Sequence, residues 1–172
     1  PSENHGGERM NIFVLSEDPI EAAQMQLNKH VVKMVLESAQ MLCAPYETGV
    51  APYKRAHYNH PCTIWARESY ENYQWLISHA LALAEEYTFR YEKTHKSEAV
   101  IRWCQENVGL LNLPKRGLTE FAVAISSDML CRNSPNFNSL SVRDKYRAYY
   151  LYDKSYMATW IKRSPPSWWC SV

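Results

Sequence analysis

The sequence predicts an all-α fold: a compact single-domain helical bundle with a short extended N-terminal segment and long loops. Its 172 residues, 46% of them hydrophobic, are enough for one ordinary core. Apolar side chains recur at helical spacing in several stretches, whereas no set of alternating runs is long enough for a sheet. We therefore expect one domain over residues 10–172, preceded at 1–9 by a polar, glycine-rich segment that is a flexible leader or a remnant of expression cloning.

Two short segments define the start of the first predicted helix. Residues 11–15 are apolar and are expected to be extended. Residues 16–19 combine candidate caps, two acids and a proline, which is typical of a helix start. One helix is predicted from about residue 19 to residue 43, with an inward face formed by Ala23, Leu27, Val31, Met34, Val35 and Leu42.

Four further helices are predicted, at about residues 61–67, 69–93, 97–107 and 141–152, with loops at 45–60 and 126–140. Asn59 or His60 can cap the first of them, because Pro61 suits the first helical position. Ser69 is a candidate cap for the long helix. Ser141 and the acid three residues later fit a capping box, and the helix that they open ends at Tyr152 or continues to Ile161.

The composition excludes several classes of protein. A net charge of +1 argues against a globally basic nucleic-acid binder, although it allows a local basic face. The longest apolar runs are too short for a membrane span, and no secretory signal pattern occurs, so a cytoplasmic protein is expected. The five cysteines are odd in number, scattered and never spaced as CxxC, which predicts reduced thiols and no metal site.

The strongest indication of chemistry lies on one flank of the first predicted helix. His30, Lys33, Glu37 and Gln40 follow one another at helical spacing beside the apolar stripe. Burial raises the pKa of a carboxyl, whereas a neighbouring cation lowers it. Together these effects can bring the pKa close to neutrality, as a general acid or base requires, so Glu37 is the first catalytic candidate. The alternative is a solvated flank on which Lys33 and Glu37 form an ordinary ion pair.

Two other segments carry candidates for ligand contact. Asn59 and His60 precede a helix start, where backbone N–H groups attract anions such as phosphate, although both side chains could simply cap the turn. Residues 143–163 hold six Lys or Arg against two Asp, interleaved with aromatic rings, which suits contact with a DNA backbone and stacking on bases. The alternative there is an amphipathic helix with its tyrosines in the core. The residues predicted to bind DNA are Arg55, Arg67, Lys145, Arg147, Tyr150, Trp160 and Lys162.

Taken in order, the segments at 11–16, 37–40 and 58–61, the following long helix and the aromatic, basic end resemble the pyrimidine-dimer DNA glycosylases of the phage endonuclease V type. The likeness covers about residues 10–95 and extends to a group of phage proteins with similar Lys-His-Val-Val-Lys-Met and Asn-His-Pro-Cys segments. The resemblance implies an all-helical domain that binds bent duplex DNA, extrudes a nucleotide and needs no metal or cofactor. It also implies that the amine of the N-terminal residue attacks the sugar C1′ and that Glu37, by position, assists base loss and strand cleavage.

One departure affects the expected nucleophile. Nine residues precede Met10, so Lys33 or Lys29 could form the imine in place of the chain's amino end. The expectation is a monomeric DNA glycosylase and lyase that acts on damaged or modified pyrimidines in double-stranded DNA, in the host cytoplasm if a phage encodes it. His30, His60 and Asn59 would orient groups or contact phosphate. The alternatives are a transferase that hypermodifies hydroxymethylated pyrimidines in phage DNA, and a non-enzymatic phage protein that binds a host partner.

Overall fold

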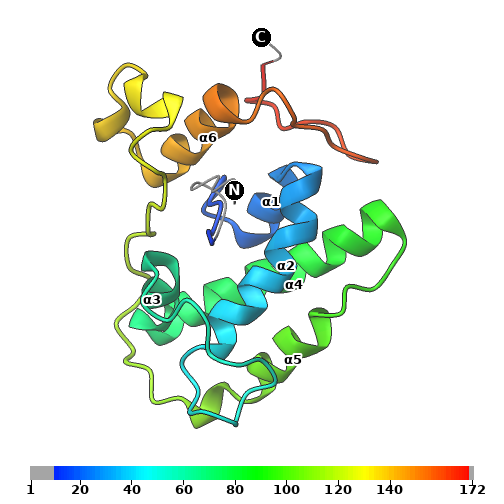
Figure 1. Cartoon of the computed structure of the whole chain (residues 1–172), viewed down its shortest axis with the longest axis vertical. Helices are drawn as coiled ribbons and strands as arrows, with labels where there is room; N and C mark the ends of the chain where they lie inside the picture. Colours follow the sequence, from blue (N-terminus) through cyan, green and yellow to red (C-terminus); the bar gives the residue numbers. More distant parts are fainter. Residues whose placement is uncertain (1–9, 171–172) are drawn as a thin grey trace, which may run out of the picture.

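The chain is built from α-helices, as a computed structural model that describes residues 10–170 shows (Figure 1). Three short 3-10 segments, at Val108–Leu110, Leu130–Asn133 and Phe137–Ser139, accompany them, and no strand occurs among residues 10–170. The predicted all-α class is confirmed, and the predicted leader at 1–9 lies outside the described residues. The helices are α1 (Pro19–Met25), α2 (Asn28–Cys43), α3 (Pro61–Glu68), α4 (Tyr70–Tyr91), α5 (Glu98–Glu106) and α6 (Val142–Asp153).

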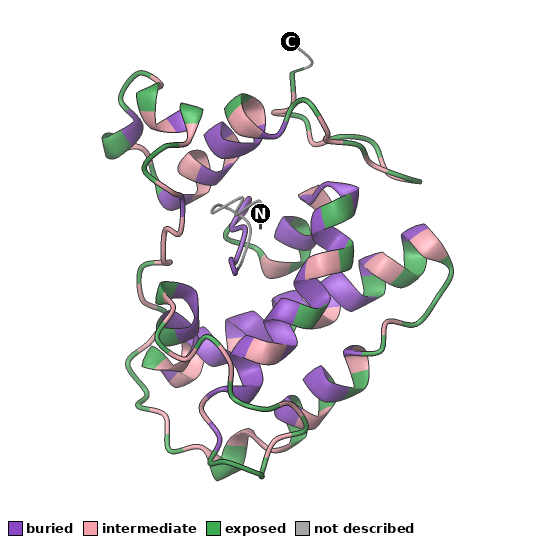
Figure 2. Ribbon diagram, in the orientation of Figure 1, coloured by how far each residue is buried: buried purple, intermediate pink, exposed green. Residues whose placement is uncertain are grey.

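The long helix α4 is the centre of the packing, because α1, α2, α3 and α5 all contact it. Figure 2 shows the buried residues concentrated where α2 and α4 cross. All six residues predicted to face inward from the first helical region are buried, which confirms the periodicity argument for α1 and α2. Within the described part of the chain, no helix has both the length and the apolar character needed to cross a membrane.

Polar side chains begin the helices at the predicted places. The carboxylate of Asp18 accepts hydrogen bonds from the N–H groups of Ile20 and Glu21 at the start of α1. The hydroxyls of Ser69 and Ser141 accept hydrogen bonds at the starts of α4 and α6. These contacts satisfy N–H groups that have no partner within the helix, so local sequence alone fixes where these helices begin.

The single helix predicted over residues 19–43 is wrong, because the chain leaves the helical conformation at Gln26 and Leu27. Contacts from distant parts of the chain satisfy the backbone there. The N–H of Leu27 donates to the hydroxyl of Tyr150 at 3.3 Å, and the N–H of Asn28 donates to the carbonyl of Thr159 at 2.9 Å. Because both acceptors lie more than 120 positions away, the local pattern could not reveal the break.

The continuation of the last helix to Ile161 is also wrong, because α6 ends at Asp153. The carboxylate of Asp153 instead accepts hydrogen bonds from the N–H groups of Leu130 and Cys131, which begin the second 3-10 segment. The chain beyond α6 then runs back along α1 and the start of α2 (Figure 1). The C-terminal residues therefore hold the junction of α1 and α2 in place.

The extended segment at residues 10–15 is buried and contacts α2, α6 and the connection before α6. The side-chain amide of Asn11 donates to the carbonyl of Ala124 at 2.9 Å, and its oxygen accepts a hydrogen bond from the hydroxyl of Tyr146 at 2.7 Å. The ring of Phe13 is parallel to the imidazole of His30, with the ring centroids 4.1 Å apart. This segment thereby fixes α6 next to α2.

Candidate active site

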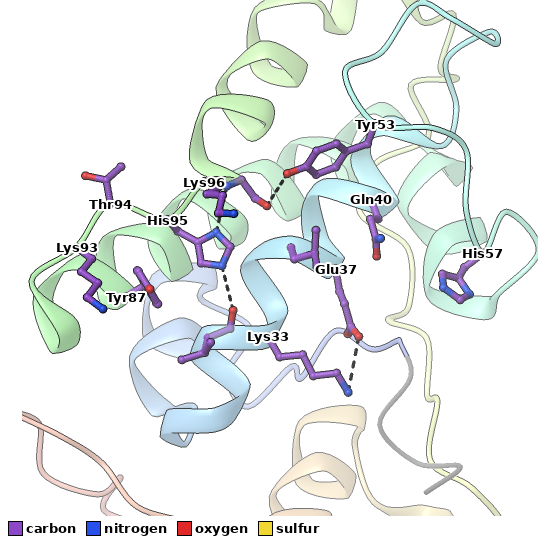
Figure 3. Close-up of a pocket in the computed structure, with 13 residues that line it drawn as sticks. Lys33, Glu37, Gln40, Tyr53, His57, Tyr87, Lys93, Thr94, His95 and Lys96 are labelled. Carbon is purple, nitrogen blue, oxygen red and sulfur yellow. Dashed lines mark hydrogen bonds and ion pairs between the residues drawn. The ribbon is translucent and has the colours of Figure 1, made fainter. Parts of the chain in front are cut away.

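The predicted flank of α2 borders a pocket of about 840 Å³, called the groove here. Three of the four residues singled out on that flank line it, namely Lys33, Glu37 and Gln40, while His30 is not among the lining residues. Figure 3 shows these three side chains on the same side of the helix. One face of α2 therefore forms one side of the groove.

Glu37 places a carboxylate at the edge of the core. Its side chain is only 8% exposed, whereas that of Lys33 is 40% exposed, and Oε1 of Glu37 lies 3.7 Å from Nζ of Lys33 (Figure 3). Burial makes a bare carboxylate costly, and the ammonium group one helical turn away offsets that cost. A carboxyl in this position can exchange a proton with a group bound in the groove.

The floor of the groove next to Glu37 is apolar. Val32 and Leu36 are 40% and 41% exposed, although most apolar side chains of α2 are fully buried. The phenol rings of Tyr53 and Tyr87 also line the groove. Exposed aliphatic and aromatic side chains around a few polar groups are typical of a site for a small planar ligand or a base.

The wall opposite α2 is the connection between α4 and α5, residues 93–97, which the sequence analysis did not single out. Lys93 and Lys96 bring two ammonium groups to it, so this wall of the groove is basic. The charge run Lys93-Thr94-His95-Lys96 was the available signal. It did not identify a site because only the folded chain brings this connection next to α2.

His95 attaches this wall to α2. Its Nδ1 accepts a hydrogen bond from the N–H of Ser97 at 3.1 Å, and its Nε2 donates to the carbonyl of Val32 at 3.2 Å. Burial lowers the pKa of His95, which is consistent with the neutral ring that the first bond requires. Next to it, the hydroxyls of Tyr53 and Ser97 lie 2.8 Å apart and connect the wall to the loop between α2 and α3 (Figure 3).

His30 lies deeper than the groove. Its ring is stacked on Phe13 and its Nδ1 lies 2.7 Å from the hydroxyl of Tyr150. The side chain is buried. The structure therefore places His30 in the packing between α2, the N-terminal segment and α6 rather than among the groove residues.

The Asn-His-Pro segment contributes mainly a helix cap. Nδ1 of His60 accepts a hydrogen bond from the N–H of Cys62 at 3.1 Å, and Asn59 is exposed. Burial lowers the pKa of His60, and the neighbouring His57 adds to that effect. His57, which the sequence analysis did not select, is the histidine of this loop that lines the groove.

The first turn of α3 still lies close to Glu37. Burial raises the pKa of the Cys62 thiol to about 12, and the negative charge of Glu37 adds to the rise. The same thiol lies 3.7 Å from the side-chain oxygen of Asn11. The Asn11 segment, the start of α3 and the catalytic candidate on α2 therefore meet in one region.

The two arginines predicted to bind DNA near this loop are engaged within it. The guanidinium of Arg55 donates to the carbonyls of Ala44 and Tyr46, and that of Arg67 donates to the carbonyl of Tyr58 at 2.6 Å. Both guanidinium groups lie over the ring of Tyr58, at 4.3 Å and 3.7 Å from its centroid. In the structure both arginines hold the loop between α2 and α3 together.

The C-terminal candidates do not gather at the groove. Tyr150 is fully buried, so it is not placed to stack on a base. Arg147 donates to the carbonyl of Leu15, and Trp160 donates to the carbonyl of Met25. Lys162 pairs with Glu92 at 2.7 Å, and Lys145 lies 5.8 Å from the ring of Phe137. Tyr146, Tyr149 and Tyr150 of α6 follow the alternative interpretation, in which they belong to the core, whereas Tyr152 is exposed.

No group of three or more His, Cys, Asp or Glu side chains within residues 10–170 is arranged to hold a metal ion. The polar groups that the groove offers to a ligand are ammonium groups, one carboxylate, two imidazoles, hydroxyls and the Gln40 amide. Such a set can bind phosphate, exchange protons and contact the edge of a base.

Comparison with known proteins agrees with this chemistry. The family model of pyrimidine dimer DNA glycosylases matches residues 10–99, more than half of the chain. The chain belongs to this family, so the resemblance in the sequence is confirmed. Every residue that lines the groove falls within the matched range, whereas α6 and the C-terminal segment lie outside it. Searches of curated proteins and of solved structures give no match.

Proposed function

We propose that the groove is the active site of a DNA glycosylase with lyase activity that acts on damaged or modified pyrimidines. Family membership implies DNA as the substrate. The observation that carries the assignment is the buried carboxylate of Glu37, which faces an open groove and pairs with Lys33. A buried carboxyl beside an amine is the combination that imine-forming cleavage of a glycosidic bond requires.

In this proposal an amine attacks C1′ of the nucleotide, the bond from C1′ to the base breaks, and the base leaves with a proton. The resulting imine activates the proton on C2′, and its removal expels the 3′ phosphate. Glu37 is the general acid and base of these steps. Its position at the inner edge of the groove partly shields the carboxyl from water. Such shielding favours proton transfer near neutral pH.

Two amines are candidates for the nucleophile. Lys33 lines the groove next to Glu37, whereas Lys29, the other lysine considered from the sequence, is exposed and does not line it. The chain's amino end is the second candidate, because the family resemblance implies that the amine of the N-terminal residue is the nucleophile. Both candidates use the same carboxylate.

The basic wall suits the DNA backbone. Lys93 and Lys96 line the wall opposite α2, and their ammonium groups can bind phosphates on either side of an extruded nucleotide. The remaining predicted contacts, His60 and Asn59 included, stay predictions. His30 supports the site indirectly through the packing of α2 on Phe13.

Borohydride trapping tests the proposal. The protein is incubated with duplex DNA that contains a thymine dimer or an abasic site, and a covalent adduct is expected on reduction. Lys33→Met abolishes the adduct if Lys33 is the nucleophile, and Lys29→Met serves as the matched control. Loss of the adduct only after acylation of the amino terminus assigns the second candidate.

Absence of an adduct and of strand cleavage under all these conditions would contradict the proposal. A nucleoside of increased mass, formed from hydroxymethylated pyrimidine DNA and a donor, would instead favour the transferase. Glycosylase activity, transferase activity and the absence of both can be distinguished, because trapping, cleavage and nucleoside mass are measured on the same reaction.

A further inference from the structure

Two buried cysteines lie next to each other where α2 packs on α5. Cys43 is the last residue of α2 and Cys104 lies within α5. Their sulfur atoms are 3.7 Å apart, and both thiols are free. The hydrogen bond between them spans 61 positions of the sequence, so folding alone brings them together.

A cavity leads to one member of this pair. A pocket of about 510 Å³ lies between the end of α2 and the loop at residues 46–55, and Cys43 is one of its lining residues while Cys104 is not. A molecule of the size of hydrogen peroxide can therefore approach Cys43 without unfolding of the helix. The buried Cys131 has no cysteine partner and lines none of the described pockets. A small oxidant therefore has a path to Cys43 that it lacks to Cys131.

The surroundings also change the acidity of the two thiols in opposite directions. The hydrogen bond from Cys104 lowers the pKa of Cys43, and a bond from the backbone N–H of Tyr53 acts in the same direction against the effect of burial. The same pairing, together with burial, raises the pKa of Cys104. Cys43 is thus the more acidic thiol of the pair, and its thiolate is the nucleophilic form.

We propose that Cys43 and Cys104 form a redox-active dithiol site that a small hydroperoxide converts into a disulfide between α2 and α5. The Cys43 thiolate attacks one peroxide oxygen: an S–O bond forms, the O–O bond breaks, and the departing oxygen takes a proton from water. The Cys104 sulfur then attacks the sulfenic sulfur of Cys43: the S–S bond forms, and hydroxide leaves as water with the Cys104 proton. The two electrons lost by the pair of thiols reduce the peroxide.

The site shares a residue with the groove. The backbone N–H of Tyr53 contacts the Cys43 sulfur, and the phenol of the same residue contacts Ser97 Oγ in the groove wall. The disulfide would join the end of α2 to the helix that directly follows this wall. Formation of the disulfide depends on the geometry and acidity of the two cysteines and is independent of the proposed glycosylase activity.

Peptide mapping of the full chain tests the proposal. The native protein is treated with hydrogen peroxide, denatured, alkylated and digested with trypsin. We expect a linked pair of peptides, residues 34–54 with 103–115, lighter by two hydrogen atoms than the sum of the free peptides. In Cys104→Ser, which lacks the second thiol, the sulfenic acid on Cys43 should be trapped by dimedone instead.

Cys131, buried but without a cysteine partner, is the internal control and should remain alkylatable throughout. Oxidation should also raise the urea midpoint of the native chain but not of Cys43→Ser, because the cross-link restricts the unfolded state. The proposal is overturned if Cys43 and Cys104 stay fully alkylatable while the exposed Cys170 is oxidised, or if Cys43 is linked elsewhere. The map of the native chain decides this even if a variant fails to fold.

Discussion

Replacement of Glu37 by glutamine removes a charge and a proton acceptor from the groove while it preserves shape. The side chain is 8% exposed, so an amide of equal size fits the same space. The i, i+4 ion pair with Lys33, whose side chain is 40% exposed, is worth only about 0.3–0.5 kcal/mol. We expect the variant to fold, with a decrease in the free energy of unfolding under about 1 kcal/mol.

The effect on rate is expected to be much larger. A positioned general acid or base contributes about 10²–10⁴-fold, which corresponds to roughly 3–5 kcal/mol of the activation barrier. Glu37→Gln should therefore lose at least about tenfold in the rate of base release and strand cleavage. DNA affinity should stay close to that of the native chain, because the ammonium groups of the groove remain.

Single-turnover cleavage of duplex DNA with one thymine dimer measures this rate, and a gel-shift titration measures affinity. Glu85→Gln is the matched control, since that glutamate is exposed on α4 and does not line the groove. Equal rates for Glu37→Gln and the native chain would remove Glu37 from the mechanism. Parallel loss of rate and of binding would assign it to DNA contact rather than to proton transfer.

Three further predictions concern stability and are checked by urea unfolding. Glu86→Gln should cost about 3 kcal/mol, because the carboxylate pairs with Arg90, whose side chain is fully buried; a loss under about 1 kcal/mol would contradict this. Tyr150→Phe should cost about 1–2 kcal/mol through the lost hydroxyl contact with His30 at 2.7 Å, and an unchanged midpoint would refute that. Burial lowers the pKa of His79 from 6.5 to about 4, so the unfolded chain binds the proton first as the pH falls. Stability should be complete above pH 6.5 and should decrease by about 3 kcal/mol toward pH 4, with a flatter profile in His79→Gln.

The helices were predictable where short-range signals fix them. Asp18, Ser69 and Ser141 all cap helices as expected, because a side-chain oxygen and the N–H groups that it satisfies lie within three residues of one another. The spacing of apolar residues likewise identified the buried face of α2. Both signals depend only on neighbours in the sequence.

The candidate site was predictable only on its α2 side. Lys33, Glu37 and Gln40 share one helix, so their common direction follows from helical geometry. The opposite wall comes from the connection between α4 and α5, and its position next to α2 depends on a hydrogen bond between His95 and Val32, 63 positions apart. No local pattern encodes such a pairing.

The break between α1 and α2 shows how a distant contact shapes the site. A continuous helix would satisfy the N–H groups of Leu27 and Asn28 internally, whereas here Tyr150 and Thr159 accept these hydrogen bonds. Tyr150 also contacts His30, which lies two residues after Asn28 in α2. Tyr150 and Thr159 lie outside the residues that the family model matches. This C-terminal part of the chain therefore fixes the start of the helix that carries Glu37. Variants in this part should affect the groove through the placement of α2 rather than through contact with DNA.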